Sequence, residues 1–421
     1  MKTYGDALDF LFARTTGIWK LGLERVEAFL HTLGDPQHRI ATIHVAGTNG
    51  KGSVCATLEA VLRAKGLRVA KYTSPHLVDF RERFVINGKP VEPDRIVDFV
   101  EKWTPEVERL GATFFEATTA MAFEFFAEAG VDVAVIETGL GGRLDATNVI
   151  RPLVAAVTTI AIDHVEYLGV TREEIAFEKA GIFKRGVPAV IGEPEVAIRS
   201  LLKLHAASHG AVPIDVVYEK GAPTSIRVTP EGTKFTLGGR SWRTPLLGAH
   251  QAANATVALA VLDQLPPELR PDAAALEHGL SRVQLPGRFQ RWGRYVFDVA
   301  HNPDAAGTLA RTLTAVAPPR PVVALLSVLA DKDWRGIMSG LGPVVDRFVL
   351  THAPTAPASR TWTIPEPLAF ARANGWQAEV SRDFDRALEL AAEGNGTVLV
   401  TGSFHTVGDA MARLEVTPAG S

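Results

Sequence analysis

A glycine-rich segment constrains this chain more than any other feature: Gly47-Thr48-Asn49-Gly50-Lys51-Gly52-Ser53. It follows an apolar run at 40–45 and precedes a helical pattern whose apolar face carries Val54, Leu58, Val61 and Leu62. A strand, a glycine-rich loop and a helix in direct succession cradle nucleotide phosphates, because loop and helix amides point at one spot and a lysine adds positive charge. We therefore predict that a polyphosphate binds Asn49, Gly50, Lys51, Gly52 and Ser53.

The segment departs from the strict phosphate-loop (P-loop) pattern at one position. That pattern requires glycine five residues before the Gly-Lys pair, and Val45 stands there. The alternative is a tight glycine-rich turn with a solvated lysine. The agreement of strand, loop and amphipathic helix favours nucleotide binding.

Length and composition narrow the remaining classes. A chain of 421 residues predicts two domains, and 46% hydrophobic with 22% charged residues is ordinary for a globular protein. A net charge of −3 gives no electrostatic reason to expect nucleic acid or an anionic membrane, so small-molecule partners are favoured. Cys55 is the single cysteine, which excludes an intrachain disulfide and fits a reducing compartment. Without a membrane-length apolar run, and with Asp6 and Asp9 near the start, we expect a cytoplasmic protein.

The order of apolar segments predicts an α/β fold. A strand at 68–73, a helix at 117–128 and strands at 131–136 and 153–160 indicate a doubly wound, mostly parallel sheet. Short alternating segments between 188 and 243 predict a small antiparallel appendage. We expect an ATP-binding domain at 1–287, a joint at Leu285-Pro286-Gly287, and a smaller Rossmann-like α/β domain at 288–421 with strands near 295–299, 322–329, 347–351 and 397–401.

Polar side chains follow two strands of the predicted first sheet. Glu137 follows the strand at 131–136, and Asp163-His164 follow the strand at 153–160. Carboxyl ends of parallel strands share one edge, where open α/β folds bind ligands. A carboxylate beside a triphosphate needs a cation between them, so we expect Glu137 to bind Mg²⁺. The alternatives are a Glu137 that caps the next turn and a His164 that is packed or solvated.

Lys179 lies on the apolar face of a helix that begins with a capping box, Thr171 and Glu174. A lysine there either snorkels outward or is buried, and burial favours the neutral amine that can add CO₂ to form a carbamate. In the second domain, Asp298 ends a strand and could hold a ribose or adenine edge, or cap the next helix. Arg288 follows the joint and could reach a phosphate.

These blocks resemble, in order, the folylpolyglutamate synthases in their bacterial bifunctional form with dihydrofolate synthase, members of the Mur ligase superfamily. The matching blocks are GTNGKGS at 47–53, TSPHL at 73–77, FEATTAMAF at 115–123, ETGLGGRLDATN at 137–148, Asp163-His164, IAFEKAGIFKRG at 175–186, GAHQAANA at 248–255, GRFQ at 287–290, DVAHNP at 298–303 and VTGSFHTVGD at 400–409. The resemblance covers most of the chain. It implies an ATP-dependent ligase that adds L-glutamate to dihydropteroate, to a reduced folate, or to both, through an acyl phosphate. Separately, we expect a monomer, although no sequence feature fixes the oligomeric state.

The resemblance also implies roles for individual residues. Ser74, Glu137 and His164 would hold magnesium, with two ions expected, and Lys179 would be carbamylated. Lys51, Lys179 and His164 would be the catalytic groups. ATP would also contact Asn254, Arg288 and Asp298. The pterin-bearing substrate would face two stretches: Phe115, Glu116, Ala117 and Thr118, and Leu144, Asp145 and Ala146.

The sequence departs from the resemblance in two places: at Ala117-Thr118, where bulkier residues are expected, and at His405, where an apolar residue is expected and to which no role is assigned. Two other functions stay open. One is a different Mur-type ligase acting on a cell-wall precursor, against which the FEATTA and TSPHL blocks argue. The other is an ATPase switch acting on a protein partner, which would hydrolyse ATP without a small carboxylate substrate.

Overall fold

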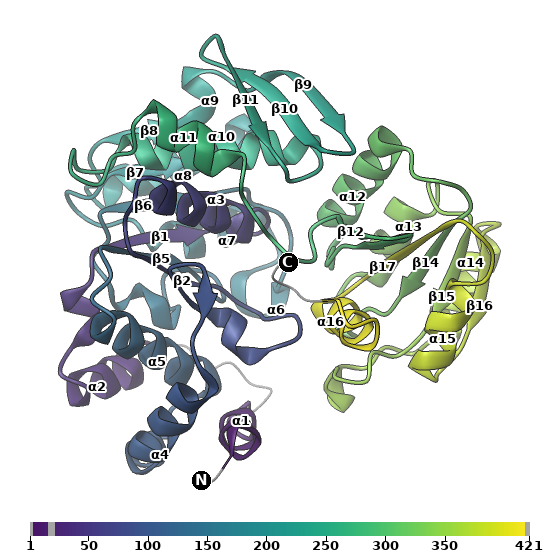
Figure 1. The fold of residues 1–421 in the computed structure, drawn as a ribbon, viewed down its shortest axis with the longest axis horizontal. Coiled ribbons are helices and arrows are strands. Elements are labelled where there is room, and N and C mark those ends of the chain that lie inside the picture. Colours follow the sequence, from purple (N-terminus) through teal and green to yellow (C-terminus); the bar gives the residue numbers. More distant parts are fainter. Residues whose placement is uncertain (1–2, 16–21, 417–421) are drawn as a thin grey trace. The chain divides into compact units, whose positions relative to one another are not determined.

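The computed structural model describes residues 3–15 and 22–416, which form two compact units (Figure 1). The first unit comprises Met1–Pro75, Arg81–Ala222 and Ala253–Leu280, and the second comprises His76–Phe80, Pro223–Ala252 and Ser281–Ser421. Among the described residues, no helix combines the length and the apolar character needed to cross a membrane.

An eight-stranded sheet with the order β4-β3-β2-β5-β1-β6-β7-β8 organises the first unit. Its parallel strands are β1 (Thr42–Ala46), β2 (Val69–Tyr72), β5 (Val133–Glu137), β6 (Val154–Val157), β7 (Ala189–Ile191) and β8 (Ile214–Val216). An antiparallel edge is formed by β3 (Phe84–Ile86) and β4 (Lys89–Pro90). Every residue of β1, β5 and β6 is buried, as expected for a parallel sheet covered on both faces. The predicted α/β class is confirmed.

The helices of the first unit follow apolar periodicity. They are α1 (Tyr4–Phe12), α2 (Glu24–Thr32), α3 (Lys51–Ala64), α4 (Pro93–Leu110), α5 (Phe114–Glu128), α6 (Val165–Leu168), α7 (Arg172–Ala180), α8 (Val196–Ser208), α9 (Val217–Lys220), most of α10 (Ala249–Asp263) and α11 (Ala273–Leu280), with short 3-10 turns at Pro36–Arg39, Phe80–Arg83 and Ala146–Val149. The four apolar residues predicted for one face of α3 are fully buried, and so is Cys55. Gly279 of α11 lies so close to α3 that a Cβ there would be 2.4 Å from the Val61 Cα.

The prediction of an antiparallel appendage from 188 onward was wrong at its start. The segment continues the parallel sheet through β7 and β8, with the 13-residue helix α8 between them. Strands of three residues are too short to show a period, so their flanking Gly and Pro residues resembled hairpin turns. The antiparallel sheet begins at β9 (Thr224–Thr229) and continues through β10 (Gly232–Leu237) and β11 (Arg240–Thr244), within the second unit.

A six-stranded sheet with the order β12-β13-β17-β14-β15-β16 forms the rest of the second unit. Its strands are β12 (Gln290–Trp292), β13 (Tyr295–Phe297), β14 (Val322–Leu326), β15 (Arg347–Leu350), β16 (Gln377–Val380) and β17 (Thr397–Thr401), and all pairs except β12–β13 are parallel. Its helices are α12 (Pro303–Val316), α13 (Trp334–Leu341), α14 (Pro365–Ala373), α15 (Phe384–Ala391) and α16 (Phe404–Arg413), with a 3-10 turn at Ala358–Arg360.

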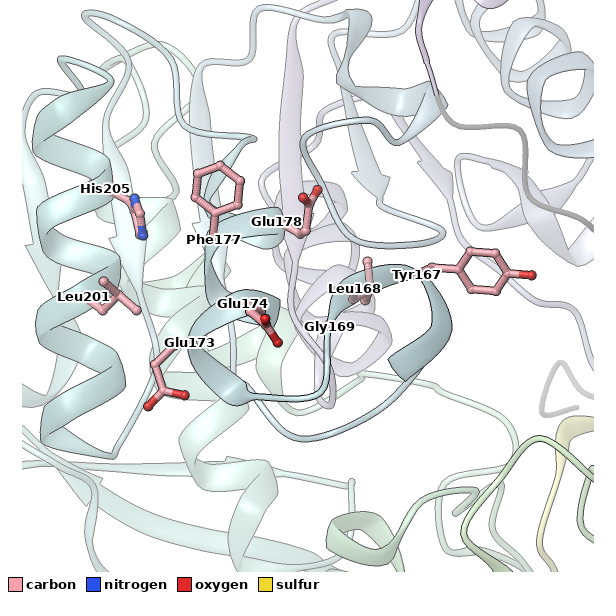
Figure 2. A pocket seen from close by; sticks show the side chains of 9 residues that line it. All are labelled: Tyr167, Leu168, Gly169, Glu173, Glu174, Phe177, Glu178, Leu201 and His205. Atoms are coloured by element: carbon pink, nitrogen blue, oxygen red, sulfur yellow. The ribbon is translucent and has the colours of Figure 1, made fainter.

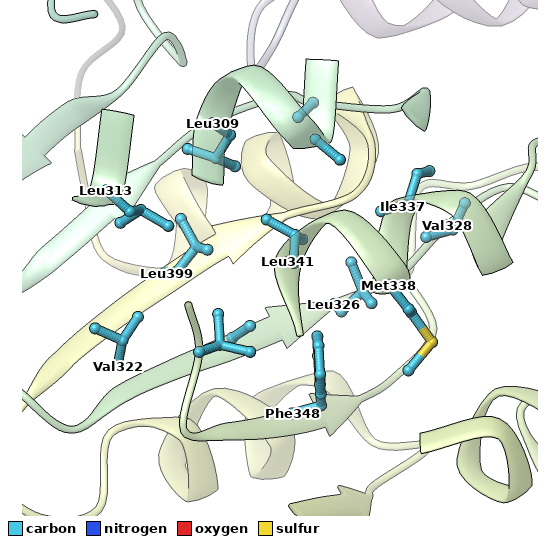
Figure 3. Packing of buried hydrophobic residues seen from close by; sticks show 14 of the residues in the cluster. Leu309, Leu313, Val322, Leu326, Val328, Ile337, Met338, Leu341, Phe348 and Leu399 are labelled. Carbon is cyan, nitrogen blue, oxygen red and sulfur yellow. The ribbon is translucent and has the colours of Figure 1, made fainter. Parts of the chain in front are cut away.

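Figure 3 shows one apolar layer of this sheet. Leu309 and Leu313 of α12 and Leu341 of α13 pack against Leu326 and Leu399 of the sheet, all with exposed fractions of 3% or less. The sequence did not predict β12 or β16. The edge strand β16 is largely exposed, so its polar sequence carries no apolar run.

Candidate functional site

The loop between β1 and α3 has two backbone positions that only glycine fits. Gly47 and Gly50 have φ values of 146° and 90°. A Cβ on Gly47 would lie 1.8 Å from the Thr158 Oγ1, and a Cβ on Gly50 would lie 2.4 Å from the Asn254 Oδ1. The loop is therefore tightly packed, and the structure places Asn254, one of the predicted nucleotide contacts, directly against it.

The start of α3 presents backbone amides and a lysine at the same place. Gly50 is the N-cap and has no side chain to bind the amides of the first turn. The Lys51 Nζ donates to the carbonyl oxygens of Gly47 at 3.0 Å and Thr48 at 3.2 Å. The ammonium thus lies over its own loop. An anion at the helix N-terminus would meet amides and a full positive charge together.

Lys179 of α7 reaches the same loop. Its Nζ donates to the Gly47 carbonyl at 3.0 Å, and the residue is only 5% exposed. Burial and, to a smaller extent, the charge of Lys51 lower the Lys179 pKa to about 7, although Asp163 and Asp145 oppose the shift. Of the two alternatives, a lysine that snorkels outward or one that is buried, the structure shows the buried one. Two lysines thus share one carbonyl acceptor, and one of them has a substantial neutral fraction near neutral pH.

Glu137 lies at the end of β5, one strand away from the loop. It pairs in register with Val45 of β1 and is 5% exposed. Its Oε2 accepts a hydrogen bond from the Ser74 backbone N–H at 3.2 Å. The buried Cys55 thiol has its pKa raised by burial and by the Glu137 charge, while Lys71 and Lys51 lower it. Both Glu137 and Lys51 therefore lie within electrostatic reach of one buried side chain.

Asp163 and His164 follow the irregular segment after β6. Asp163 is buried, and its Oδ1 accepts the His164 backbone N–H at 2.9 Å and lies 3.9 Å from the His164 Nε2. His164 has a left-handed φ of 52° and is the N-cap of α6. Because Asp163 acts electrostatically on Lys179, this segment belongs to the same region as the loop.

No cluster of three or more His, Cys, Asp or Glu side chains suited to a metal ion occurs among residues 3–15 and 22–416. The predicted ligands Ser74, Glu137 and His164 nevertheless fit magnesium, because Mg²⁺ in nucleotide sites uses one or two carboxylates and takes its other oxygens from phosphate and water. Glu137 is a buried carboxylate adjacent to Ser74, and His164 is only partly buried. Glu137, Ser74 and His164 therefore stay the predicted metal ligands.

The stretch predicted to face an organic substrate is mostly committed to the protein interior. The Glu116 carboxylate accepts the Thr113 backbone N–H at 2.8 Å in a capping box and pairs with Arg25 at 2.9 Å. Ala117 and Thr118 are fully buried. Phe115 is half-buried, and its ring packs so tightly on Gly139 that a Cβ there would be 2.3 Å from the Phe115 Cζ. Among residues 115–118, Phe115 is therefore the one whose side chain is partly exposed and could contact a substrate.

Asp145 and Ala146 are buried, whereas Leu144 is half-buried. The Asp145 carboxylate accepts the backbone N–H groups of Leu140 at 2.7 Å and Thr147 at 3.0 Å and the Thr147 hydroxyl at 2.5 Å. Burial raises the Asp145 pKa. Asp145 therefore shapes the 137–148 loop from within.

Sequence reasoning missed His44, which continues this network. Its Nε2 lies 2.8 Å from the Thr147 Oγ1, and burial lowers its pKa to about 3, so the ring is neutral at pH 7. The Thr147 hydroxyl donates to Asp145, so His44 is the donor in this pair. A histidine inside the otherwise apolar strand β1 was the available signal.

In the second unit, Arg288 and Asp298 lie close to the turn after β13. Asp298 accepts the backbone N–H groups of Phe289 at 2.8 Å and Ala300 at 3.0 Å, and burial raises its pKa while Arg288 lowers it. The Arg288 guanidinium carbon lies 5.1 Å from the centroid of the Phe404 ring. His405, which received no role, has its Nδ1 3.0 Å from the Thr355 Oγ1.

A separate hollow of about 510 Å³ lies among α6, α7 and α8 (Figure 2). Its lining includes Tyr167, Glu173, Phe177 and His205, and the Phe177 and His205 rings lie 5.5 Å apart. None of the predicted site residues lines it.

Comparison with known proteins gives two family matches. Residues 45–262 match the Mur ligase middle domain, and residues 282–404 match the Mur ligase glutamate ligase domain. Among curated proteins, the chain is similar to the dihydrofolate synthase/folylpolyglutamate synthase of Escherichia coli, with 37% identity over 95% of this chain and 93% of that protein.

Solved structures agree with the sequence matches. The folylpolyglutamate synthase of Mycobacterium tuberculosis complexed with ADP superimposes with a TM-score of 0.89 at 34% identity, covering 97% of this chain and 98% of that one. The bifunctional folylpolyglutamate synthase/dihydrofolate synthase of Yersinia pestis, complexed with AMPPNP and a manganese ion, has a TM-score of 0.83 at 35% identity, covering 99% and 98%.

Proposed function

Because the chain belongs to the dihydrofolate synthase/folylpolyglutamate synthase family of Mur ligases, we propose that it is an ATP-dependent ligase that joins L-glutamate to dihydropteroate, to a reduced folate, or to both. The observation that carries the proposal is the convergence of Lys51 and Lys179 on the Gly47 carbonyl. Lysine groups gathered at a glycine-rich loop favour an anionic ligand, and the triphosphate of ATP is such a ligand.

The loop and Lys51 bind and neutralise the phosphates of ATP. Asn49, Gly50, Gly52 and Ser53 complete the cradle with backbone amides and the Ser53 hydroxyl. Phosphoryl transfer requires little covalent participation by a protein, so positioning and charge neutralisation account for most of the rate. Lys51 moves from the Gly47 and Thr48 carbonyls to a phosphate oxygen, a better acceptor because it is charged.

Glu137, Ser74 and His164 are the proposed protein ligands of magnesium. A divalent cation bound there supplies charge neutralisation between the phosphates and the nearby carboxylates. Glu137 is suited to this role because it is buried, so an uncompensated charge there is costly. The ADP, AMPPNP and manganese in structures of relatives support the nucleotide and divalent metal assignments.

Carbamylation of Lys179 belongs to the same proposal. A pKa of about 7 leaves about half of the amine neutral at pH 7, and the neutral amine is the form that adds CO₂. A carbamate keeps one N–H, so the 3.0 Å hydrogen bond to the Gly47 carbonyl can persist. The new negative charge would face Lys51, whose charge already acts on Lys179.

The substrate carboxylate attacks the γ-phosphorus, the bond to ADP breaks, and an acyl phosphate forms. The amine of L-glutamate then attacks the acyl carbon and releases phosphate, which leaves an amide. We propose that Phe115 and Leu144 face the pterin-bearing substrate, while Asp145 and Ala146 shape the loop that carries Leu144 and Glu116 to Thr118 hold the start of α5. Asn254, Arg288 and Asp298 remain proposed nucleotide contacts.

ADP formation measured with dihydropteroate and with tetrahydrofolate, each with and without L-glutamate, tests this function. The ligase predicts sustained ADP release only when glutamate and at least one of the two carboxylates are present together. Equal release with neither substrate would overturn the ligase in favour of a simple ATPase. Use of both carboxylates would establish the bifunctional form.

A further inference from the structure

The segment at 159–161, between β6 and the proposed metal ligand His164, is bound on both sides through its backbone. Thr48 of the phosphate loop lies on one side. Its backbone N–H donates to the Thr159 carbonyl at 2.7 Å, and its hydroxyl oxygen lies 3.1 Å from both the Ala161 N and the Ala161 O. The side chain of Thr48 therefore contacts the chain rather than projecting toward a ligand.

An ion pair between the partly exposed Arg172 and the buried Glu193 holds the central residue, Ile160, from the other side. The Glu193 Oε2 accepts the Ile160 backbone N–H at 2.7 Å, and the Arg172 Nε donates to the Ile160 carbonyl at 2.9 Å. The two side chains bond each other, with the Arg172 Nη2 3.1 Å from the Glu193 Oε1. Glu193 is 1% exposed, so its charge depends on partners within the protein, which also include the Glu195 backbone N–H at 2.9 Å.

The arrangement gives each backbone polar group from the Thr159 carbonyl to the Ala161 carbonyl a partner distant in sequence. A loop would ordinarily leave such groups to water. Two further bonds tie the segment to the phosphate loop, from the Thr158 and Thr159 hydroxyls to the Asn49 carbonyl at 2.7 and 3.2 Å. The segment is therefore held as firmly as a strand although it has no strand partner.

We propose that Thr48 and the Arg172–Glu193 pair are positioning residues that hold Asp163-His164 in register with the phosphate loop, so that metal and phosphate sites form as one unit. The inference rests on the proposed role of His164 as a metal ligand. Metal sites tolerate little displacement of their ligands, and the groups that orient the ligands set affinity as strongly as the ligands' identity. None of the three residues needs to touch the metal.

The decisive variant is Arg172→Lys. Lysine keeps the charge beside Glu193 but lacks the planar fork that bonds the Ile160 carbonyl and the carboxylate together. The matched control is Arg270→Lys, between α10 and α11. The Arg270 Nη2 also donates to a backbone carbonyl, that of Leu265 at 3.0 Å, but the segment it holds contains none of the proposed ligands or positioning residues.

Mn²⁺ binding to the full chain, followed by electron paramagnetic resonance with AMPPNP present, is the main measurement. We expect Arg172→Lys to weaken Mn²⁺ binding about tenfold and Arg270→Lys to change it less than twofold. ADP affinity in EDTA should stay within about twofold of the parent in both. Amide exchange of a peptide spanning 158–164 should quicken in Arg172→Lys alone.

Thr48 supplies a second, independent pair of variants. Thr48→Val removes the hydroxyl that bonds Ala161, whereas Thr48→Ser keeps it. Mn²⁺ binding should weaken in the valine variant and recover in the serine variant. Equal behaviour of the two would remove the Thr48 side chain from the inference.

His164→Ala separates this inference from the proposed function. If His164→Ala weakens Mn²⁺ binding and Arg172→Lys leaves it at the parent value, the positioning inference is overturned and the metal assignment stands. If His164→Ala binds Mn²⁺ normally, the metal assignment fails and the inference fails with it. Weakening in both variants, with the Arg270→Lys control unchanged, supports both.

Discussion

Each unit contains a strand, a polar turn and a helix in succession, and the two turns satisfy their amides differently. In the first unit, β1 leads through Gly47 to Gly50 into α3, and Gly50 has no side chain to cap the helix. In the second, β13 leads into α12, where Asn302 accepts the Ala305 N–H at 2.9 Å and Asp298 accepts the Ala300 N–H at 3.0 Å. An anion site at a helix N-terminus therefore requires backbone N–H groups that no side-chain oxygen of the protein already binds.

The largest expected effect is that of Lys51→Met. Loss of the charge over the phosphate loop should lower turnover at least about 1000-fold, since neutralisation of the transferred phosphoryl group is the main contribution of the protein. Steady-state ADP formation measures it. Lys65→Met, at the far end of α3, should retain activity within about twofold. Turnover near the parent value in Lys51→Met would contradict the assignment of this loop as the phosphate site.

The second-largest effect should be the loss of nucleotide affinity in Gly50→Ala. At a φ of 90° alanine is strained, and its Cβ would lie 2.4 Å from the Asn254 Oδ1. We expect nucleotide affinity to fall about 10- to 100-fold, measured by calorimetric titration with ADP. Gly111→Ala is the control, because Gly111 also has a positive φ of 61° but no atom within 4 Å of its would-be Cβ. Equal losses in both variants would mean that backbone strain alone explains the result.

The rate at which bicarbonate restores activity should increase about tenfold between pH 6 and pH 8, because Lys179 loses its proton over this range. Because its pKa is about 7 rather than 10.5, the neutral amine rises from about a tenth to about nine-tenths between pH 6 and pH 8. After CO₂ depletion, the rate of reactivation by bicarbonate, corrected for dissolved CO₂, should therefore increase with pH over this window. Reactivation independent of pH, or absence of a carbamate signal in ¹³C NMR, would contradict carbamylation.

The same pKa has a stability consequence. Between about pH 7 and pH 10.5 the unfolded chain binds a proton at Lys179 that the folded chain does not, so the contribution of this site to stability rises with pH over that window. Below about pH 7 both states bind the proton, and the full cost of burying the charge remains. Lys179→Met should flatten this part of the profile, measured by urea unfolding.

The smallest effect should be that of Asn302→Ala in the second unit. Loss of the N-cap should cost about 1 kcal/mol of stability. Urea unfolding measures it, and Asn302→Asp should restore most of the loss because aspartate also caps. Gly50→Ala and Asn302→Ala thus test the comparison in opposite directions: the first should lower ligand affinity and the second should lower stability.

Long apolar segments were predictable because their periodicity reflects burial directly. β1, α3, β5 and the α7 capping box all follow from residue spacing, and so does the position of Lys179 on the same face as Ile175 and Ile182, although spacing left its burial open. Strands of three residues, such as β7 and β8, and the exposed edge strand β16 carry too little pattern to be recognised.

Two mostly parallel sheets could be predicted from the sequence because burial on both faces requires apolar runs. The strand ends were less exact: the strand predicted at 153–160 ends at Val157. Tertiary contacts determine which polar residues stabilise the fold instead of facing a ligand. Glu116 caps α5 and pairs with Arg25, and Glu193 accepts the Ile160 backbone N–H. A carboxylate is chemically the same in every role, and its partners, brought from distant parts of the chain, decide whether it supports the fold or meets a ligand.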